Sequence, residues 1–212
     1  MVNVIRLAMR DWLMTGKLPP PSRYPTLTGG NLVSPTRLAM GFPAGVPGVP
    51  ESIFAPENFV FPVLDYDWGP QFNHSDATGV ATNLPPPIRH VIPMKVPRVD
   101  ADGNELGGVP TVLRDAPLGT YLGWNITTGG FHQGQVCNYV GGYIPFATTL
   151  AERQANGDPR RSLVERYGNH AGYVAAVTAA ANHAFSQGYL LAADRAALIA
   201  AAAASTVLLV AN

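Results

Sequence analysis

The sequence predicts an α+β fold: an N-terminal helix, a long Pro/Gly-rich irregular segment with short strands or hairpins, and a C-terminal helical region. Three observations predict this arrangement. Apolar residues recur at helical spacing at the start of the chain, prolines crowd its middle, and helix-capping patterns occur in its last third. We therefore divide the 212 residues into 1–16, 17–145 and 146–212.

The first helix is indicated by apolar residues at helical spacing. They are Val2, Ile5, Met9, Trp12 and Leu13. The pattern predicts an amphipathic helix through Met14 with one buried stripe, stopped by Gly16 and by the prolines at 19–21. No capping residue precedes this helix, so it looks like the middle of a longer one. We expect Met1 to be an internal start, a processing product or a fragment boundary.

Proline dominates the middle segment, where all but two of the 20 prolines lie between Pro19 and Pro117. Each proline removes an amide donor and fixes its own φ, which disfavours long helices and central strands. Residues 19–57 are therefore expected to form loop. Only 13% of the chain is charged and 47% is hydrophobic, so the segment is expected to wrap against another surface.

Two stretches of the middle segment predict strands. Residues 59–66 alternate apolar and aromatic side chains around Pro62, which suits an edge strand. Residues 89–99 are similar and lead into a hairpin with Asp102 and Gly103 at its turn. A second bend is available at 107–108, before residues 109–113.

The same turn also invites a calcium interpretation, because Asp100, Asp102 and Asn104 place oxygen atoms at alternate positions. The pattern departs from a calcium loop at two places. Gly103 is fourth in the loop where the sixth position needs glycine, and Thr111 stands where the twelfth needs glutamate. We therefore expect a hairpin turn and no metal site.

The last third predicts helices. Thr149 with Glu152, and Ser162 with Glu165, match the capping-box pattern and indicate two short helices separated at 156–159. A longer helix is expected over 170–187, ended by Gly188. Its expected packing face carries Val174, Val177, Ala181 and Ala184. A final helix is expected to begin near Asp194, whose charge suits a helix N-terminus, and to run to about Leu209.

Charge and hydropathy narrow the range of partners. The formal net charge is zero and no basic run is longer than Arg160-Arg161, so nucleic acid is not an expected partner. Residues 196–211 carry no charge, but a membrane span needs about 20 strongly apolar residues and this run is shorter and rich in alanine. We expect a helix packed on another surface there, with a membrane anchor as the weaker alternative.

Candidate substrate-lining residues lie in and after the stretch 118–125. Tyr121 and Trp124 offer large aromatic surfaces with one polar atom each, and Asn125 and His132 follow them. Together they could form one wall of a pocket, because pockets combine aromatic walls with a few polar groups. The aromatic pair could instead anchor an irregular segment on a core, which is the commoner role of large aromatics.

No catalytic residue is expected within this chain. A serine nucleophile elbow needs glycines two positions before and two after the serine, and no serine here has the first glycine. His74, Ser75 and Asp76 are adjacent and cannot align as a triad, so a polar surface turn is expected. The single cysteine, Cys137, is expected to be packed and inert, with a nucleophilic role assisted by His132 as a weak alternative.

Three stretches carry a family resemblance. They are RDWLMTGKLPPPSRYPTL at 10–27, LDYDWGPQF at 64–72, and the run at 99–167 that contains VDADGNELGGVPTVLRDAPLGTYLGWN and GGYIPFATTLAERQANGDPRRSLVERY. The chain resembles, over nearly its whole length, the C-terminal part of a poorly characterised family of large α/β-hydrolase-domain proteins. The resemblance implies that residues 1–16 are the last helix of a hydrolase core.

The resemblance also implies a function. An ester or amide of small-molecule size would be hydrolysed by a serine nucleophile located outside this chain, with no cofactor. The family's nucleophile, acid and histidine correspond to no position here. The implied partner is an upstream hydrolase core or a separate chain, and this chain would supply scaffold and pocket wall. The alternative is a non-enzymatic interaction module, or separate subunit, that docks through its proline-rich segment.

Overall fold

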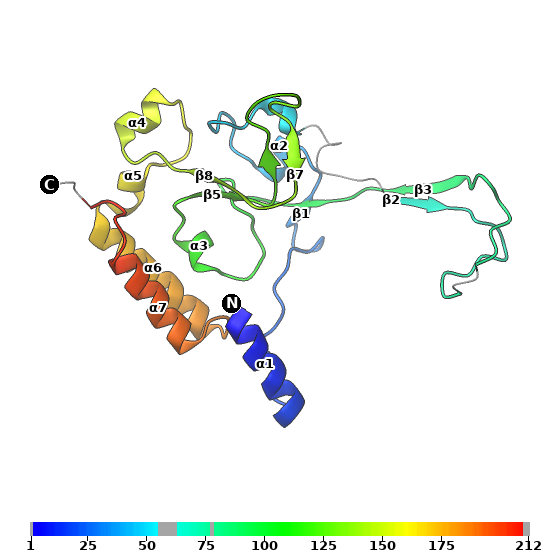
Figure 1. The fold of residues 1–212 in the computed structure, drawn as a ribbon, viewed down its shortest axis with the longest axis horizontal. Coiled ribbons are helices and arrows are strands. Elements are labelled where there is room, and N and C mark those ends of the chain that lie inside the picture. The colour runs from blue at the N-terminus through cyan, green and yellow to red at the C-terminus, as the bar shows by residue number, and fades with distance from the viewer. Residues whose placement is uncertain (1, 55–62, 77–78, 210–212) are drawn as a thin grey trace.

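The computed structural model describes residues 2–54, 63–76 and 79–209. Figure 1 shows a body of irregular segments and short sheets, with the pair α6 and α7 packed along one side and the hairpin β2–β3 extending from the other. Helices and short antiparallel strands both occur, which confirms the α+β prediction.

The N-terminal helix α1 spans Val2–Thr15, and Gly16 ends it with a φ of 75°. The prediction that its apolar stripe is buried is wrong. Val4 is the buried residue of α1, whereas Ile5 and Leu13 are 61% and 71% exposed. The helix meets the body on its Val4 side, where the Asn3 amide donates to Asp194 at 2.9 Å, and its apolar face therefore points to solvent.

The strands among the described residues pair antiparallel in two-stranded sheets. The pairs are β1 (Leu32–Val33) with β4 (Val96–Pro97), β2 (Val63–Tyr66) with β3 (Ile88–Ile92), β5 (Gly119–Leu122) with β8 (Gly142–Pro145), and β6 (Asn125–Ile126) with β7 (Val136–Asn138). The predicted strand at 59–66 is confirmed at 63–66, and its first half lies outside the described residues. The predicted extended stretch at 89–99 divides between β3 and β4, which take different partners.

The predicted hairpin turn is confirmed. Val99 and Glu105 form an isolated antiparallel bridge, and the amide of Gly103 donates to the carbonyl of Asp100 at 3.0 Å. Gly103 has a φ of 82°, a conformation that suits glycine. One carboxylate oxygen of Asp100 accepts the amides of Asp102 and Asn104, both at 2.9 Å, so the Asp100 side chain stabilises the turn.

Short helices occur within the proline-rich segment, where residues 19–57 were expected to form only loop. These are α2 (Arg37–Met40), the 3-10 helix η1 (Glu51–Phe54) and, further on, α3 (Val112–Asp115). Threonine explains two of them, because the hydroxyls of Thr36 and Thr111 accept amides of the first turns of α2 and α3.

The C-terminal helices are α4 (Leu150–Ala155), α5 (Leu163–Tyr167), α6 (His170–Ser186) and α7 (Ala192–Ala203). The predicted capping box at Ser162 and Glu165 is confirmed in both directions. The final helix ends at Ala203 and not near Leu209 as predicted. At its end, the hydroxyl of Ser205 donates to the carbonyl of Ala202 at 2.7 Å. Among the described residues, no helix has the length and apolarity to cross a bilayer.

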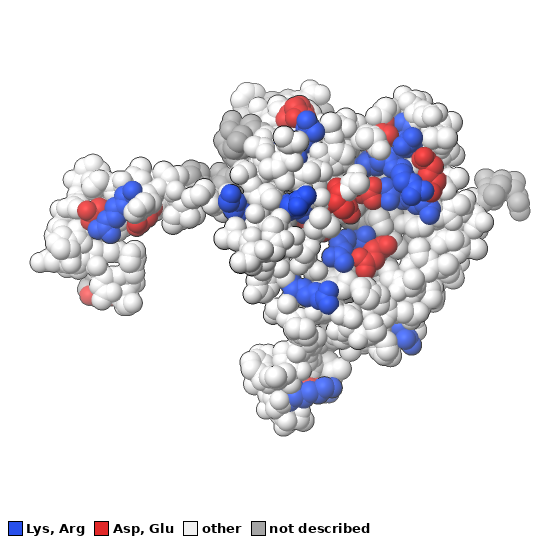
Figure 2. Space-filling model, turned by 180° about the vertical axis from the view of Figure 1, so that it is seen from behind, with Lys and Arg blue, Asp and Glu red and all other residues white. Residues whose placement is uncertain are grey.

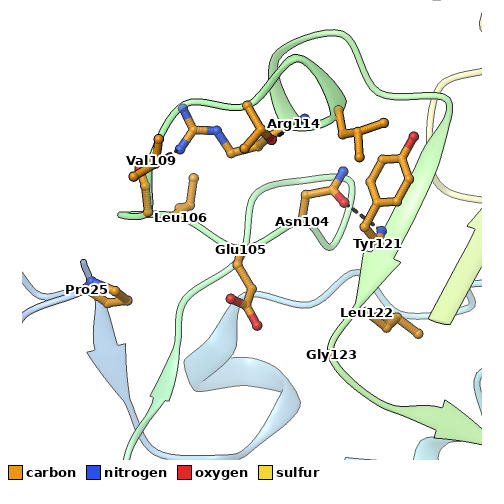
Figure 3. Close-up of a pocket in the computed structure, with 12 residues that line it drawn as sticks. Pro25, Asn104, Glu105, Leu106, Val109, Arg114, Tyr121, Leu122 and Gly123 are labelled. Carbon is orange, nitrogen blue, oxygen red and sulfur yellow. Dashed lines mark hydrogen bonds between the residues drawn. The ribbon is translucent and has the colours of Figure 1, made fainter. Parts of the chain in front are cut away.

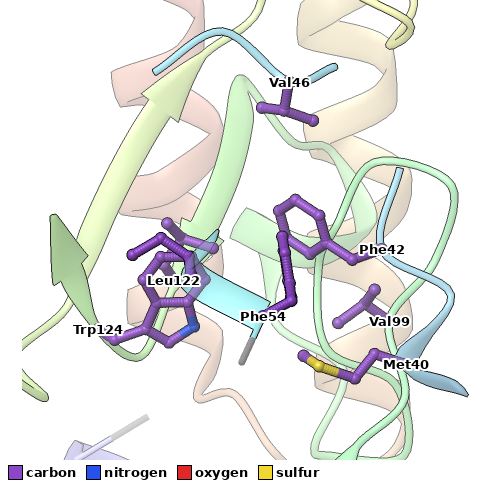
Figure 4. Packing of buried hydrophobic residues seen from close by; sticks show 8 residues of the cluster. Met40, Phe42, Val46, Phe54, Val99, Leu122 and Trp124 are labelled. Atoms are coloured by element: carbon purple, nitrogen blue, oxygen red, sulfur yellow. The ribbon is translucent and has the colours of Figure 1, made fainter. Parts of the chain in front are cut away.

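The buried apolar residues form separate clusters. The largest, shown in Figure 4, joins α2, η1 and the ends of β5 and β6. Its buried members are Met40, Phe42, Val46, Ile53, Phe54, Val99, Leu122 and Trp124. Two smaller clusters lie along α6, where Val177, Ala181 and Ala184 are buried and Val174 packs against them as predicted. The large cluster forms the floor beneath the candidate site.

Candidate functional site

The candidate site consists of two adjoining cavities beside β5. The first has a volume of about 360 Å³ and is lined by Pro25, Asn104, Glu105, Leu106, Gly108, Val109, Thr111, Leu113, Arg114, Tyr121, Leu122 and Gly123 (Figure 3). The second, of about 160 Å³, is lined by Met40, Phe42, Val96, Pro97, Val99, Gly103, Glu105, Tyr121, Leu122, Gly123, Trp124 and Tyr139. The residues common to both are Glu105, Tyr121, Leu122 and Gly123. A hollow of this combined size suits a small organic molecule.

The hairpin turn fixes the wall of these cavities through Asn104, which is buried. Its side-chain oxygen accepts the amide of Tyr121 at 2.8 Å, and its side-chain nitrogen donates to the carbonyl of Gly119 at 3.2 Å. Asn104 thereby pairs with β5 as a neighbouring strand would. The turn and β5 are consequently held together at the place where the two cavities meet.

Glu105 follows Asn104 and carries a carboxylate into the space between the cavities. The structure gives it no hydrogen bond or ion pair among the described residues. Desolvation by the surrounding protein raises the pKa of its carboxyl group, although the residue is exposed at the cavity mouth. A Cβ added at Gly123 would lie 3.9 Å from Glu105 Oε1, so the carboxylate stands directly over this glycine.

Arg114 lines the far end of the first cavity, and its charge is already engaged. Its Nε donates to Asp115 Oδ1 at 3.0 Å and its Nη1 to the carbonyl of Gly108 at 3.2 Å. Figure 3 shows the Arg114 guanidinium beside Val109, with the Glu105 carboxylate pointing the other way. The two side chains therefore do not neutralise each other.

Tyr121 lies on β5 in the wall of both cavities, one of the four residues proposed from the sequence as substrate-lining. Its ring stacks on Tyr143 with centroids 5.3 Å apart, and its hydroxyl accepts the amide of Leu118 at 3.4 Å. Burial raises the pKa of its phenol. The hydroxyl therefore stays protonated near neutral pH and is suited to donate a hydrogen bond.

The other three sequence-predicted residues are placed differently. Trp124 is buried in the large cluster and lines the second cavity. Asn125 donates to Asn138 and to the carbonyl of Val140, at 3.2 and 2.9 Å, and so holds the β6–β7 hairpin. His132 lies in an exposed loop with its Nδ1 2.9 Å from Gln135 Oε1. Neither Asn125 nor His132 lines the two cavities, and a substrate-lining role for the four remains a prediction.

Glu105 and Arg114 are candidate site residues that were not predicted from the sequence. Glu105 follows the predicted turn and Arg114 lies in α3, and only the folding of these segments beside β5 brings both residues to one cavity. The spacing of Asn104 and Glu105 after the Asp102-Gly103 turn was the available signal, because a turn directs the residues after it back along the preceding strand.

Two sequence expectations about reactive groups have clear outcomes. Cys137 is exposed, so the prediction of a packed thiol is wrong. Its strand β7 pairs with β6, and the residues of β7 are half-buried or exposed. His74 and Ser75 lie in an exposed turn in which the Ser75 amide donates to Asn73 Oδ1 at 2.9 Å, which confirms the polar turn.

The fold and the cavities define an α+β protein with a partly apolar hollow that could accommodate a small molecule. A family model described as "Alpha/beta hydrolase domain" matches residues 1–200. The chain therefore belongs to the α/β-hydrolase-domain family, as its resemblance indicated, and the membership indicates a hydrolase-type function. No curated protein and no solved structure matches the chain.

Proposed function

We propose that this chain is the C-terminal portion of an α/β-hydrolase-domain protein that hydrolyses an ester or amide with a serine located outside the chain. The family match supports the hydrolase class. The absence of a G-x-S-x-G sequence within these residues supports an external nucleophile. The chain itself supplies scaffold and one wall of the substrate pocket.

The uncovered face of α1 carries this proposal. The apolar side chains of Ile5, Met9 and Trp12 are exposed, although their spacing is that of a buried helix face. They line a cavity of about 260 Å³ with Pro19–Pro21 and Tyr189. Figure 2 shows charged side chains gathered around α4 and α5, while α1, which projects downwards, is mostly uncharged. Such a surface is typical of a binding face, and we propose that the hydrolase core covers it.

The experiment is co-expression of this chain with the polypeptide encoded immediately upstream, followed by size-exclusion chromatography and hydrolysis of p-nitrophenyl acetate. The double variant Met9→Glu, Trp12→Glu should break the complex and abolish hydrolysis. A matched variant, Ile88→Glu, changes an equally exposed apolar residue on the distant hairpin β2–β3 and should leave both unchanged. Normal binding by the α1 variant, or hydrolysis by the chain alone, would contradict the proposal.

A second candidate function rests on the hairpin β2–β3. This hairpin extends from the body in Figure 1, and its Ile88 and Val91 are 54% and 59% exposed. Exposed apolar strands are ready to pair with another chain. The chain would then be a non-enzymatic interaction module that docks through its proline-rich segment. In that case Ile88→Glu, and not the α1 variant, would release the partner, and no assembly would hydrolyse the ester.

A further inference from the structure

The junction of the two cavities holds a negative charge that has no partner among the residues that the structure describes. Glu105 reaches this junction from the end of the hairpin turn and lines both cavities, and among the described residues its carboxylate has no hydrogen bond or ion pair. Burial in the cavity wall raises the pKa of this carboxyl group, in keeping with a carboxylate that has no cation beside it among the described residues. The cavities therefore contain a carboxylate that the described residues do not neutralise.

The surroundings of this carboxylate favour a ligand that is both apolar and cationic. Tyr121, Trp124 and Tyr139 line the second cavity beside it, and aromatic rings attract cations as well as hydrocarbon. Arg114, the cation of the first cavity, is held by Asp115 and by the carbonyl of Gly108. An anionic ligand would be repelled by the Glu105 charge, while a neutral one would displace water from the carboxylate without supplying a counter-charge.

We propose that these cavities bind a small organic ammonium ion, with the Glu105 carboxylate as its counter-charge and the aromatic residues against its hydrocarbon part. This deepens the proposed function and rests on it only in one respect: the bound ion would be the ammonium-bearing portion of the ester or amide substrate. Binding of the ion to this chain does not require the hydrolase core.

The test is isothermal titration of the full chain with four probes. Choline and protonated phenethylamine are the cations, 3,3-dimethylbutan-1-ol is the uncharged isostere of choline, and 3-phenylpropionate is an anion of similar size to phenethylamine. We expect at least one cation to bind about 10-fold more tightly than its uncharged or anionic counterpart, which corresponds to about 1.4 kcal/mol. Preference for choline would indicate ring–cation contact, and preference for phenethylamine a hydrogen bond to the carboxylate.

Three variants test whether Glu105 and the cavity beside it bind the cation. Glu105→Gln should remove the preference for cations, whereas Glu51→Gln, an exposed glutamate that lines neither cavity, should keep it. Gly123→Val should block every probe, because its side chain would occupy the space under Glu105. Equal binding of charged and uncharged probes, no binding of either cation, or unchanged binding by Glu105→Gln would overturn the inference. Cation binding by a chain whose assembly hydrolyses no ester would instead overturn the proposed function alone.

Discussion

The guanidinium of Arg160 is buried against the carboxylate of Asp158, with Nη2 2.7 Å from Oδ2 and Nε 2.9 Å from Oδ1. The same guanidinium donates to Thr120 Oγ1 at 2.8 Å and to the carbonyl of Ile144 at 3.0 Å. One side chain thus joins the loop between α4 and α5 to both strands of the β5–β8 sheet. Because β5 also carries Tyr121, the ion pair indirectly supports the wall of the candidate site.

Replacing Arg160 with Leu should cost about 3–5 kcal/mol of stability, since it leaves the Asp158 carboxylate buried without its partner. Guanidinium chloride unfolding, followed by circular dichroism, measures the change. Arg161→Leu is the matched control: this neighbour is exposed and donates to a carbonyl, and its loss should stay within about 0.5 kcal/mol. Equal losses for the two variants would refute a structural role specific to the buried pair.

The Asp158 carboxyl should also make stability depend on pH. Burial alone would raise its pKa, but hydrogen bonds from Arg160 and its positive charge outweigh burial and hold the pKa below the ordinary 3.8. The unfolded state therefore binds the proton more readily, so this contribution is complete above pH of about 4 and is lost as the pH falls through the lower, folded-state pKa. Unfolding of Asp158→Asn between pH 7 and pH 2 should show a weaker loss on acidification than the unchanged chain, and a parallel pair of curves would argue against it.

Features that depend on neighbouring residues were predictable from the sequence. The capping box at Ser162, the helix end at Gly188 and the turn at Asp102 and Gly103 all follow from local hydrogen bonding and backbone conformation. The family could be recognised from its motifs, and the match over residues 1–200 confirms it.

Features that depend on distant pairing were not predictable. Nothing in the order of residues shows that Asn104 pairs with β5, or that Arg160 is buried while Arg161 is exposed. The helix α1 and its amphipathic pattern were predicted, but its apolar stripe is exposed, because periodicity does not reveal whether a covering surface belongs to this chain. Glu105 escaped notice for the same reason, because a cavity is made by segments far apart in the sequence.

Two tryptophans lie in contrasting environments, one in the large buried cluster and one on the exposed face of α1. Trp124 is 8% exposed and meets Phe54 edge-on with centroids 6.4 Å apart, whereas Trp12 is 48% exposed on α1. Trp124→Ala should cost about 3–5 kcal/mol, because it opens a cavity in the large cluster. Trp12→Ala should change the stability of the chain by less than about 1 kcal/mol. Thermal and denaturant unfolding measure both, and a costly Trp12→Ala would show that α1 is covered within this chain.

Gly172, in the first turn of α6, should not tolerate alanine. Helix propensity alone favours alanine over glycine by about 1 kcal/mol. A Cβ at this position, however, would lie 1.9 Å from the carbonyl oxygen of Tyr167, far inside contact distance, so the backbone between α5 and α6 would have to move. We expect Gly172→Ala to lower the melting temperature and Gly108→Ala, whose Cβ would meet nothing within 4 Å, to leave it nearly unchanged. A stabilised Gly172→Ala would mean that this junction is free to shift.

Glu105 should affect stability in the direction opposite to Asp158. Desolvation raises the pKa of its carboxyl group in the folded chain, so the folded state holds the proton more tightly than the unfolded state. Its effect on stability is therefore absent below the unfolded pKa and becomes unfavourable as the pH rises through the folded pKa. Glu105→Gln removes this unfavourable contribution, and the variant should be at least as stable as the unchanged chain at pH 7 and similar to it at pH 3. Unfolding curves at the two pH values check the sign. A variant less stable at pH 7 would place Glu105 in the scaffold, whereas a variant that is stable but no longer prefers cations would place it in the binding site.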